Sequence, residues 1–221
     1  MMETLERILS TFAAVLFRNQ WRDLRANLLT LHELYVESLA SRIPPILIQA
    51  LVAAEDRRFY THGAIDPVAI IRAISRFLTQ RRIEGASTIE QQFVRTVTAR
   101  YEKTLRRKLR EILLATLVKT VIPKEDLPGV YLSVAYFGWR MNGIKQACNR
   151  LNVSLEQMTL EQATSIVARL KYPEPRVAST TRTEQIVTRS RYILCLVKRA
   201  NLATKETLHE ELVDGTFPVV Y

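Results

Sequence analysis

Glu55 is the first residue whose type and setting suggest acid–base chemistry. It follows Leu47 and Leu51 at helical spacing, so a carboxylate ends an apolar stripe. Removal from water disfavours the charged form of a carboxylate, and such a group can act as a general base or acid near neutral pH. A salt bridge to Arg57 or Arg58 is the alternative explanation for the same residue.

The segment 95–110 is a second candidate, because it holds seven basic residues against a single acid. On a helix, Lys103, Arg107 and Glu111 share one face. The opposite, buried face would then hold Leu105, Leu109, Ile112 and Leu113. Lysine and arginine side chains aimed in one direction suit a phosphate or pyrophosphate. A solvated basic face with an ordinary Arg107–Glu111 pair is the alternative.

The elements that must position these residues are predicted to be helices. Apolar residues recur at a spacing of three to four, the chain has only six glycines, and no hairpin is evident. The expected helices are one or two amphipathic helices over 3–40, then 46–60, a helix from Asp66 through Leu78, one holding 91–94, and helices over 103–121, 127–136, 143–151, 160–170 and 183–200.

Helix-start signals support these assignments. Pro44 and Pro45 mark the start of the helix predicted over 46–60, and Asp66 followed by proline predicts an N-cap. Ser87 with Glu90 has the spacing of a capping box. We therefore expect an all-α protein with an N-terminal part, 1–43, of amphipathic helices and a main domain over 44–221. Core packing and membrane-surface association both remain open for the N-terminal helices.

Composition limits the function classes. The net charge of +10 implies an anionic partner, namely nucleic acid, an anionic membrane surface or a phosphate-bearing substrate. Tyr101 is the only aromatic residue within 95–110, which argues against nucleic acid. The two cysteines and three histidines lie outside zinc-ligand and disulfide patterns. No apolar run near the start reaches the roughly 20 residues needed to cross a bilayer, and no signal peptide is evident.

Five segments, read in order, resemble the signature motifs of glycosyltransferase family 51. They are EDRRFYTHGAID (55–66), GASTIEQQFVR (85–95), RKLRE (107–111), VYLSVAYFG (130–138) and ATSIVARLKYP (163–173). Five ordered matches are far more specific than any one of them. The resemblance is to the monofunctional peptidoglycan glycosyltransferases, which correspond to the transglycosylase domain of class A penicillin-binding proteins.

The resemblance implies a lysozyme-like helical lobe with a smaller, membrane-facing jaw. It also implies an enzyme that polymerises lipid II into glycan strands by inverting glycosyl transfer, with release of undecaprenyl pyrophosphate. Glu55 matches the base that deprotonates the acceptor 4-hydroxyl, and Glu111 matches the second essential carboxylate, near the leaving group. Arg95, Lys103 and Arg107 match pyrophosphate-binding cations, in agreement with the basic face.

Further residues match motif positions whose individual roles the resemblance does not separate. They are Asp56, Phe59, His62, Asp66, Gly85, Ser87, Thr88, Gln91, Gln92, Lys108 and Tyr131. A divalent cation such as Mg²⁺ is expected near Glu111, because carboxylates and a pyrophosphate form a hard oxygen site. The expected partners are lipid II, the growing strand, the membrane surface and a transpeptidase. The expected location is the outer face of the bacterial cytoplasmic membrane.

Four positions depart from the family pattern. Ala64 and Arg169 stand where glycine is usual, Glu90 where Thr or Ser is usual, and Ser133 where Asn is usual. Ala64 is expected to strain its loop if the backbone there needs a positive φ. A catalytically impaired member that binds lipid II or the membrane is therefore the alternative function. A lytic lysozyme-like enzyme is disfavoured, because hydrolysis of a neutral glycosidic bond gives the basic row no pyrophosphate to hold. The residues 176–221 are read as scaffold.

Overall fold

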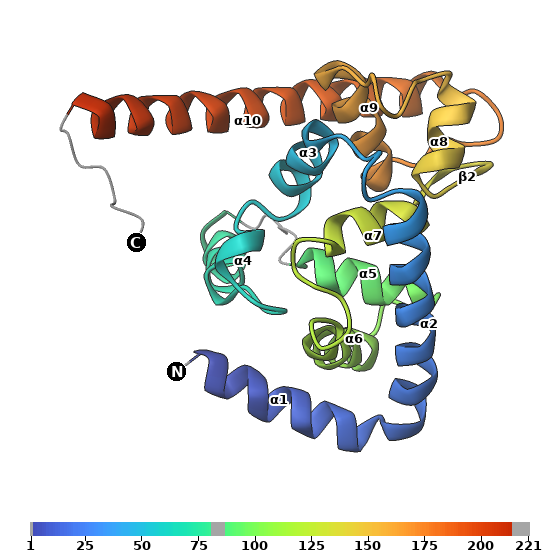
Figure 1. Cartoon of the computed structure of the whole chain (residues 1–221), viewed down its shortest axis with the longest axis vertical. Helices are drawn as coiled ribbons and strands as arrows, with labels where there is room; N and C mark the ends of the chain where they lie inside the picture. The colour runs from blue at the N-terminus through green and yellow to red at the C-terminus, as the bar shows by residue number, and fades with distance from the viewer. Residues whose placement is uncertain (1, 81–86, 214–221) are drawn as a thin grey trace.

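The computed structural model describes residues 2–80 and 87–213, so Gly85 lies outside the described residues. In chain order the elements are α1 (Met2–Leu16), α2 (Arg18–Ser38), α3 (Pro45–Glu55), the 3₁₀ turn η1 (Phe59–Thr61), α4 (Pro67–Gln80), α5 (Ile89–Val97), α6 (Leu105–Val118), α7 (Leu127–Val134), β1 (Tyr136–Gly138), β2 (Met141–Asn142), α8 (Ile144–Leu151), α9 (Leu160–Lys171) and α10 (Thr180–Val213) (Figure 1). The predicted all-α class is confirmed.

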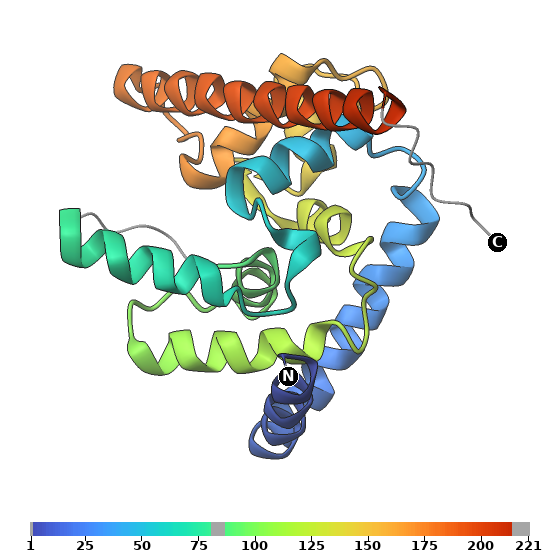
Figure 2. The ribbon, with the colours of Figure 1, turned by 90° about the vertical axis from the view of Figure 1, so that its left-hand side faces the viewer.

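The helices form two groups on opposite sides of the molecule. Figure 2 shows α3, α9 and α10 along one side and α6 with α1 along the other, with α4 and α5 between them. Contacts agree, because α10 packs on α9 and α3, whereas α6 packs on α1 and α5. A single apolar core extends through both groups, from Leu28 of α2 to Ile193 of α10. The proposed division at residue 43 stays a prediction.

One close helix contact depends on a missing side chain. A Cβ atom at Gly129 would lie 2.4 Å from the Tyr35 hydroxyl, so glycine is needed where α7 meets α2. His32 of α2 also hydrogen-bonds the carboxylate of Asp126 at 2.8 Å, directly before α7. These contacts fix α7, whose Tyr131 hydrogen-bonds Gln92 of α5.

The sequence predicts no hairpin, but the structure contains one. The strands β1 and β2 pair antiparallel, with Tyr136 opposite Asn142. Arg140, in the turn between them, has a φ of 58°. A non-glycine residue with positive φ carries no sequence signal of a turn comparable to Asn-Gly, which explains why the hairpin was missed.

The departures at 169 and 133 are accommodated locally. The Arg169 Nε atom lies 2.8 Å from the Glu174 carboxylate, and its Nη1 donates to the Ser165 carbonyl at 2.8 Å. The arginine therefore ties α9 to the loop that follows it. The Ser133 hydroxyl donates to the Val130 carbonyl within α7.

Candidate active site

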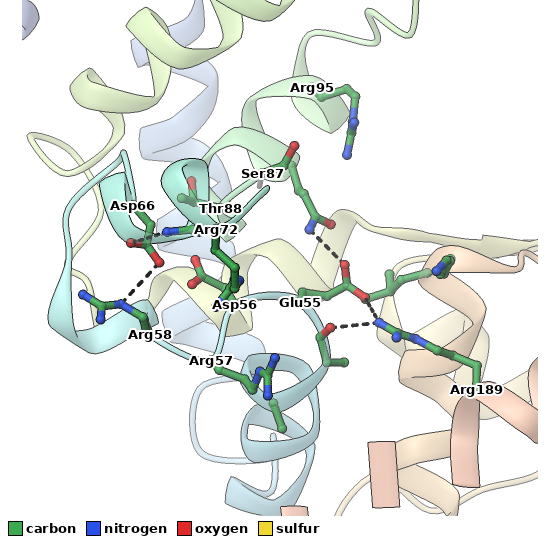
Figure 3. Close-up of a pocket in the computed structure, with 16 residues that line it drawn as sticks. Glu55, Asp56, Arg57, Arg58, Asp66, Arg72, Ser87, Thr88, Arg95 and Arg189 are labelled. Atoms are coloured by element: carbon green, nitrogen blue, oxygen red, sulfur yellow. Dashed lines mark hydrogen bonds and ion pairs between the residues drawn. The ribbon is translucent and has the colours of Figure 1, made fainter. Parts of the chain in front are cut away.

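Glu55, the last residue of α3, faces a cavity of about 590 Å³ formed by α3, α4, α5, α9 and α10. Its side chain is 16% exposed, so it is accessible from the cavity but largely desolvated. Gln92 donates its amide to Glu55 Oε2 at 3.0 Å. Arg189 lies on the other side, with Nη2 3.3 Å from Glu55 Oε1 and 2.8 Å from the Ala54 carbonyl (Figure 3).

Arg189 is the partner that sequence reasoning missed. The alternative considered for Glu55 was a salt bridge to Arg57 or Arg58, but Arg58 pairs with Asp66 at 3.4 Å and Glu55 pairs with Arg189. Arg189 also belongs to the segment that was read as scaffold. Nothing in the local sequence pattern links it to Glu55.

Tyr131 of α7 connects to the same carboxylate through Gln92. Its hydroxyl donates to Gln92 Oε1 at 3.0 Å, so the amide of Gln92 is held with its NH₂ group toward Glu55. Burial raises the pKa of Tyr131 well above its usual value, and the charge of Glu55 adds to the effect. Tyr131 is therefore a fixed donor that keeps Gln92 in one orientation.

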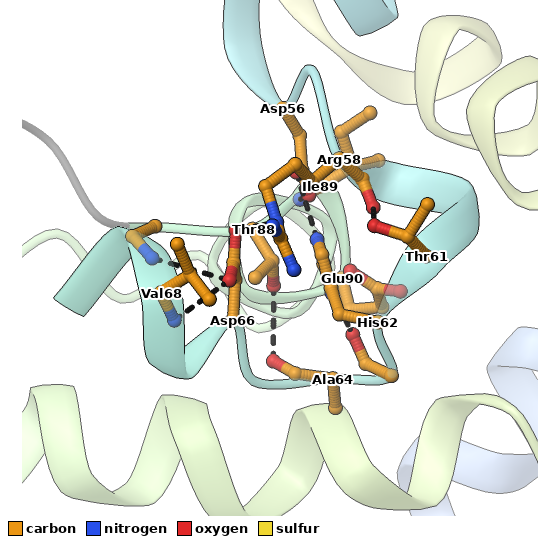
Figure 4. Close-up of polar contacts among 12 residues, drawn as sticks. Asp56, Arg58, Thr61, His62, Ala64, Asp66, Val68, Thr88, Ile89 and Glu90 are labelled. Atoms are coloured by element: carbon orange, nitrogen blue, oxygen red, sulfur yellow. Dashed lines mark hydrogen bonds and ion pairs between the residues drawn. The ribbon is translucent and has the colours of Figure 1, made fainter. Parts of the chain in front are cut away.

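The chain leaves helix α3 immediately after Glu55, because Asp56 has non-helical backbone angles, with φ −155° and ψ 77°. This corrects the predicted helix end near residue 60. Asp56 Oδ1 lies 2.8 Å from His62 Nε2, and Oδ2 accepts from the Ile89 backbone N–H at 3.3 Å (Figure 4). The loop after Glu55 is thereby fixed to the start of α5.

Two further contacts bind this loop to its neighbours. The prediction that Asp66 caps a helix is confirmed, since its Oδ1 accepts from the Val68 and Ala69 backbone N–H groups at 3.0 and 3.1 Å. The Ala64 carbonyl accepts from Thr88 Oγ1 at 3.1 Å and from Gln91 Nε2 at 3.0 Å. Ala64 is not among the described residues with positive φ, so the expected strain is absent.

Thr88 rather than Ser87 is the N-cap of α5, which corrects the predicted capping box. Glu90 is not the reciprocal partner of a cap. It is 2% exposed and forms an ion pair with Lys124, whose ammonium also lies 3.8 Å from the centroid of the Phe59 ring. Burial raises the pKa of Glu90, and Lys124 opposes that effect. The motif residue Phe59 therefore rests on a buried ion pair.

Glu111 is 3% exposed and is flanked by two cations of its own helix. Arg107 Nη1 pairs with Glu111 Oε2, and Lys108 Nζ lies 3.0 Å from Oε1. Lys108 also donates to Ser87 Oγ at 2.8 Å and to Gln91 Oε1 at 2.6 Å. The adjacent glutamines of α5 thus serve different carboxylates. Gln92 hydrogen-bonds Glu55 directly, whereas Gln91 accepts from Lys108, the lysine that pairs with Glu111.

The charge around Glu111 is strongly positive. Burial lowers the pKa of Lys108, and the nearby Arg95 and Arg107 lower it further, whereas Glu111 raises it. Arg95, at the end of α5, lines the Glu55 cavity and points into it (Figure 3). An anion at this end of the cavity would be attracted by these side chains.

Lys103 and the two leucines do not lie where the helical pattern placed them. Thr104 is the N-cap of α6, so Lys103 precedes the helix and is exposed. Leu105 and Leu109, expected on the buried face, are 90% and 61% exposed. The buried residues of α6 begin only at Glu111, so the first turns extend beyond the core.

Asp56, His62 and Asp66 are a buried group whose ligand atoms lie within 4.8 Å of one another. Their atoms are already engaged: the two Asp56 oxygens with His62 and Ile89, and those of Asp66 with the start of α4 and Arg58. Burial acts to lower the His62 pKa, but the hydrogen bond and charge of Asp56 outweigh it and raise the pKa. The two His62 ring nitrogens face the Gly63 carbonyl and the Asp56 carboxylate, so neither is open to a cation, and this group does not fit Mg²⁺.

Glu111 does not fit a dication in this arrangement either, because each of its oxygens already pairs with a cationic side chain.

The cavity that Glu55 faces has a cationic lining. Its basic side chains are Arg57, Arg58, Arg72, Arg95, Lys171 and Arg189, against the acids Glu55, Asp56 and Asp66. The cavity thus combines a desolvated carboxylate with surrounding positive charge. Such a site can deprotonate a hydroxyl group while holding an anionic substrate.

Comparison with known proteins shows the family of the chain. The family model described as Transglycosylase matches residues 28–198. Penicillin-binding protein 1A of Rickettsia prowazekii is 32% identical over 177 residues, which cover 78% of this chain and 22% of the relative. Penicillin-binding protein 1A of Escherichia coli is 37% identical over 134 residues, covering 60% of this chain and 16% of the relative. The chain thus spans about a fifth of the length of these relatives. It belongs to the transglycosylase family.

Proposed function

We propose that this chain is a peptidoglycan glycosyltransferase that extends glycan strands from lipid II and releases undecaprenyl pyrophosphate. The observation that carries the proposal is the setting of Glu55, a partly accessible carboxylate oriented by Gln92 and Arg189 in a cationic cavity. In this proposal Glu55 removes the proton from the acceptor 4-hydroxyl as that oxygen attacks the anomeric carbon. The bond from that carbon to the pyrophosphate oxygen breaks, and the configuration inverts.

The leaving pyrophosphate accumulates negative charge, which fixed cations stabilise without reorganisation. Arg95, Arg107 and Lys108 are suited to this role because Arg107 and Lys108 pair with Glu111, and Arg95 lines both the Glu55 cavity and a small pocket that also contains Arg107 and Glu111. Glu111 then holds Arg107 and Lys108 in place. Mg²⁺ would supply further neutralisation of the pyrophosphate, but the carboxylates of Asp56 and Glu111 are already paired with side chains.

A membrane-surface face supports a lipid-linked substrate. Exposed apolar side chains gather on α1 and the first turns of α6, which pack together; they are Ile8, Phe12, Val15, Leu16, Leu105 and Leu109. A neighbouring groove of about 890 Å³ combines Leu16, Phe17 and Leu109 with arginines, among them Arg100 and Arg106. Apolar side chains bordered by arginine suit an anionic bilayer surface. Among the described helices, none is long and apolar enough to cross a membrane.

The test is polymerisation of purified lipid II in detergent, resolved by glycan length, for the wild type, Glu55→Gln and Glu111→Gln. Glu161→Gln is the control, because Glu161 is exposed on α9 and far from the cavity lining. We expect strands from the wild type and the control only. Binding of lipid II without strands from the wild type would contradict the proposal and favour an accessory, lipid II-binding role.

A further inference from the structure

A shallower groove of about 430 Å³ adjoins the Glu55 cavity across Arg189, which lines both. Tyr172, at the end of α9, forms one side of the groove. The other side is formed by residues of α10, namely Thr181, Glu184, Gln185, Thr188 and Tyr192. The Arg189 guanidinium carbon lies 5.5 Å from the centroid of the Tyr192 ring, while the same guanidinium contacts Glu55. The groove therefore shares Arg189 with the candidate active site.

The lining has the composition of a carbohydrate subsite. Thr181, Gln185, Thr188 and Tyr192 recur at helical spacing, so they share one face of α10. The Tyr192 ring, beside Arg189, and the Tyr172 ring, near Lys171 and Arg182, bring aromatic surface with terminal hydroxyl groups to the groove. The threonines, Gln185 and Glu184 offer donors and acceptors. A pyranose ring has the matching pattern, with C–H groups on its faces and hydroxyls at its rim.

Other ligands fit this lining less well. An acyl chain would leave the hydroxyl, amide and carboxylate groups without partners. A phosphate would face the Glu184 carboxylate, and Arg189, the basic side chain in the lining, is already engaged by the Ala54 carbonyl and Glu55. A neutral sugar avoids both problems.

We propose that this groove binds one N-acetylhexosamine unit of the glycan whose reacting end lies at Glu55. The proposal rests on the proposed function for the reacting end, but it concerns binding and can be measured without turnover. Tyr192 supplies the main stacking surface. It is 49% exposed, so replacing it should leave the core packing of its buried neighbour Ile193 intact.

The experiment is a calorimetric or NMR titration of the full chain with the β-1,4-linked tetramer of N-acetylglucosamine and with soluble, uncross-linked glycan strands. We expect Tyr192→Ala to raise the Kd by about tenfold, because a stacked aromatic ring commonly changes affinity by a factor of that order. Tyr192→Phe keeps the ring and should bind nearly as the wild type does. Val187→Ala is the matched control, because Val187 is exposed on α10 and lies outside the groove.

Gln185→Ala separates groove binding from an indirect effect through Arg189, since it leaves the Tyr192–Arg189 contact in place. It should weaken binding as well. Saturable binding that is unchanged in both Tyr192→Ala and Gln185→Ala, or no saturable binding by the wild type, would overturn the proposal.

Lipid II polymerisation by the same variants distinguishes the two proposals. We expect Gln185→Ala, which leaves the Tyr192–Arg189 contact in place, to raise KM while kcat is kept. Glycan binding at the groove by a chain that makes no strands would contradict the proposed function alone. Normal KM and strand length in Gln185→Ala would contradict the groove alone.

Discussion

Arg189 and Glu55 are separated by 134 positions in the sequence, yet Arg189 Nη2 lies 3.3 Å from Glu55 Oε1. The same nitrogen donates to the Ala54 carbonyl, so a backbone contact at the end of α3 also holds the guanidinium beside the carboxylate. A long helix that looked like scaffold thereby brings a fixed cation to the proposed base.

Arg189→Met should lower kcat/KM for lipid II polymerisation by roughly ten- to a hundredfold, because charge-assisted hydrogen bonds contribute about 1.5–3 kcal/mol. Arg189→Lys should recover part of the loss, since a point charge returns without the planar fork. Arg191→Met is the control, as Arg191 is exposed on the same helix. If Arg189→Met were as active as the control, the proposed contribution of Arg189 to catalysis would be wrong.

Gln92→Met should lower kcat by about tenfold or more, because Glu55 loses its amide donor and is then oriented by Arg189 alone. Tyr131→Phe should have a smaller effect, since it removes only the hydrogen bond that orients Gln92. Steady-state rates together with thermal melting would show the order. A larger loss in Tyr131→Phe than in Gln92→Met, with both folded, would contradict this hydrogen-bonded chain.

Breaking the Glu90–Lys124 ion pair should destabilise the fold. A buried charge left without its partner costs about 3–5 kcal/mol. Lys124→Met should cost more than Glu90→Gln, because the Glu90 side chain is 3% exposed and that of Lys124 is 24% exposed. The double variant Glu90→Gln with Lys124→Met should regain much of the loss, because no unpaired charge is left. Urea denaturation measures all four proteins, and additive single effects would show that the pair does not interact.

His62 should make stability depend on pH. Its pKa in the folded chain is raised above 6.5, chiefly by Asp56 acting against the opposing effect of burial and of Lys124. The native state therefore binds a proton more tightly than the unfolded chain. The stabilisation is fully present below about pH 6.5 and is lost as the pH rises through the folded pKa. Denaturation of the wild type and His62→Gln from pH 5 to 9 should show this dependence only in the wild type.

The membrane-surface face predicts a partition experiment. Leu105→Ser with Leu109→Ser should lower binding to phosphatidylglycerol-rich vesicles, because both side chains are exposed apolar groups beside the arginine-lined groove. Leu202→Ser is the control, since Leu202 is 59% exposed on α10, on the opposite side of the molecule. Flotation of vesicles measures the bound fraction. Equal binding by both variants would place the membrane contact elsewhere.

The sequence predicted the helical class and several helix starts because these depend on neighbours in the chain. Asp66 is an example, since its cap bonds reach only two and three residues ahead. Ser87 and Thr88 show the limit of such reasoning, because both hydroxyls precede α5 and only the backbone conformation selects Thr88. Leu105 and Leu109 fit an apolar stripe, but the pattern does not reveal that no core covers that turn.

The candidate site was predictable to the extent that its residues lie in short motifs. Glu55, Gln92 and Glu111 were identified in this way, and the structure joins each to partners within reach. Arg189 was not, because its contact with Glu55 follows from the packing of α10 on α3. Only the tertiary arrangement brings that side chain to the cavity.

Glu90 and Lys124 depend on each other unequally. Without Lys124, Glu90 would be a buried anion with no counter-ion, whereas without Glu90, Lys124 would keep partial solvation and its contact with the Phe59 ring. Position 124 can therefore be redesigned only together with position 90, while position 90 can be changed by itself at a smaller cost.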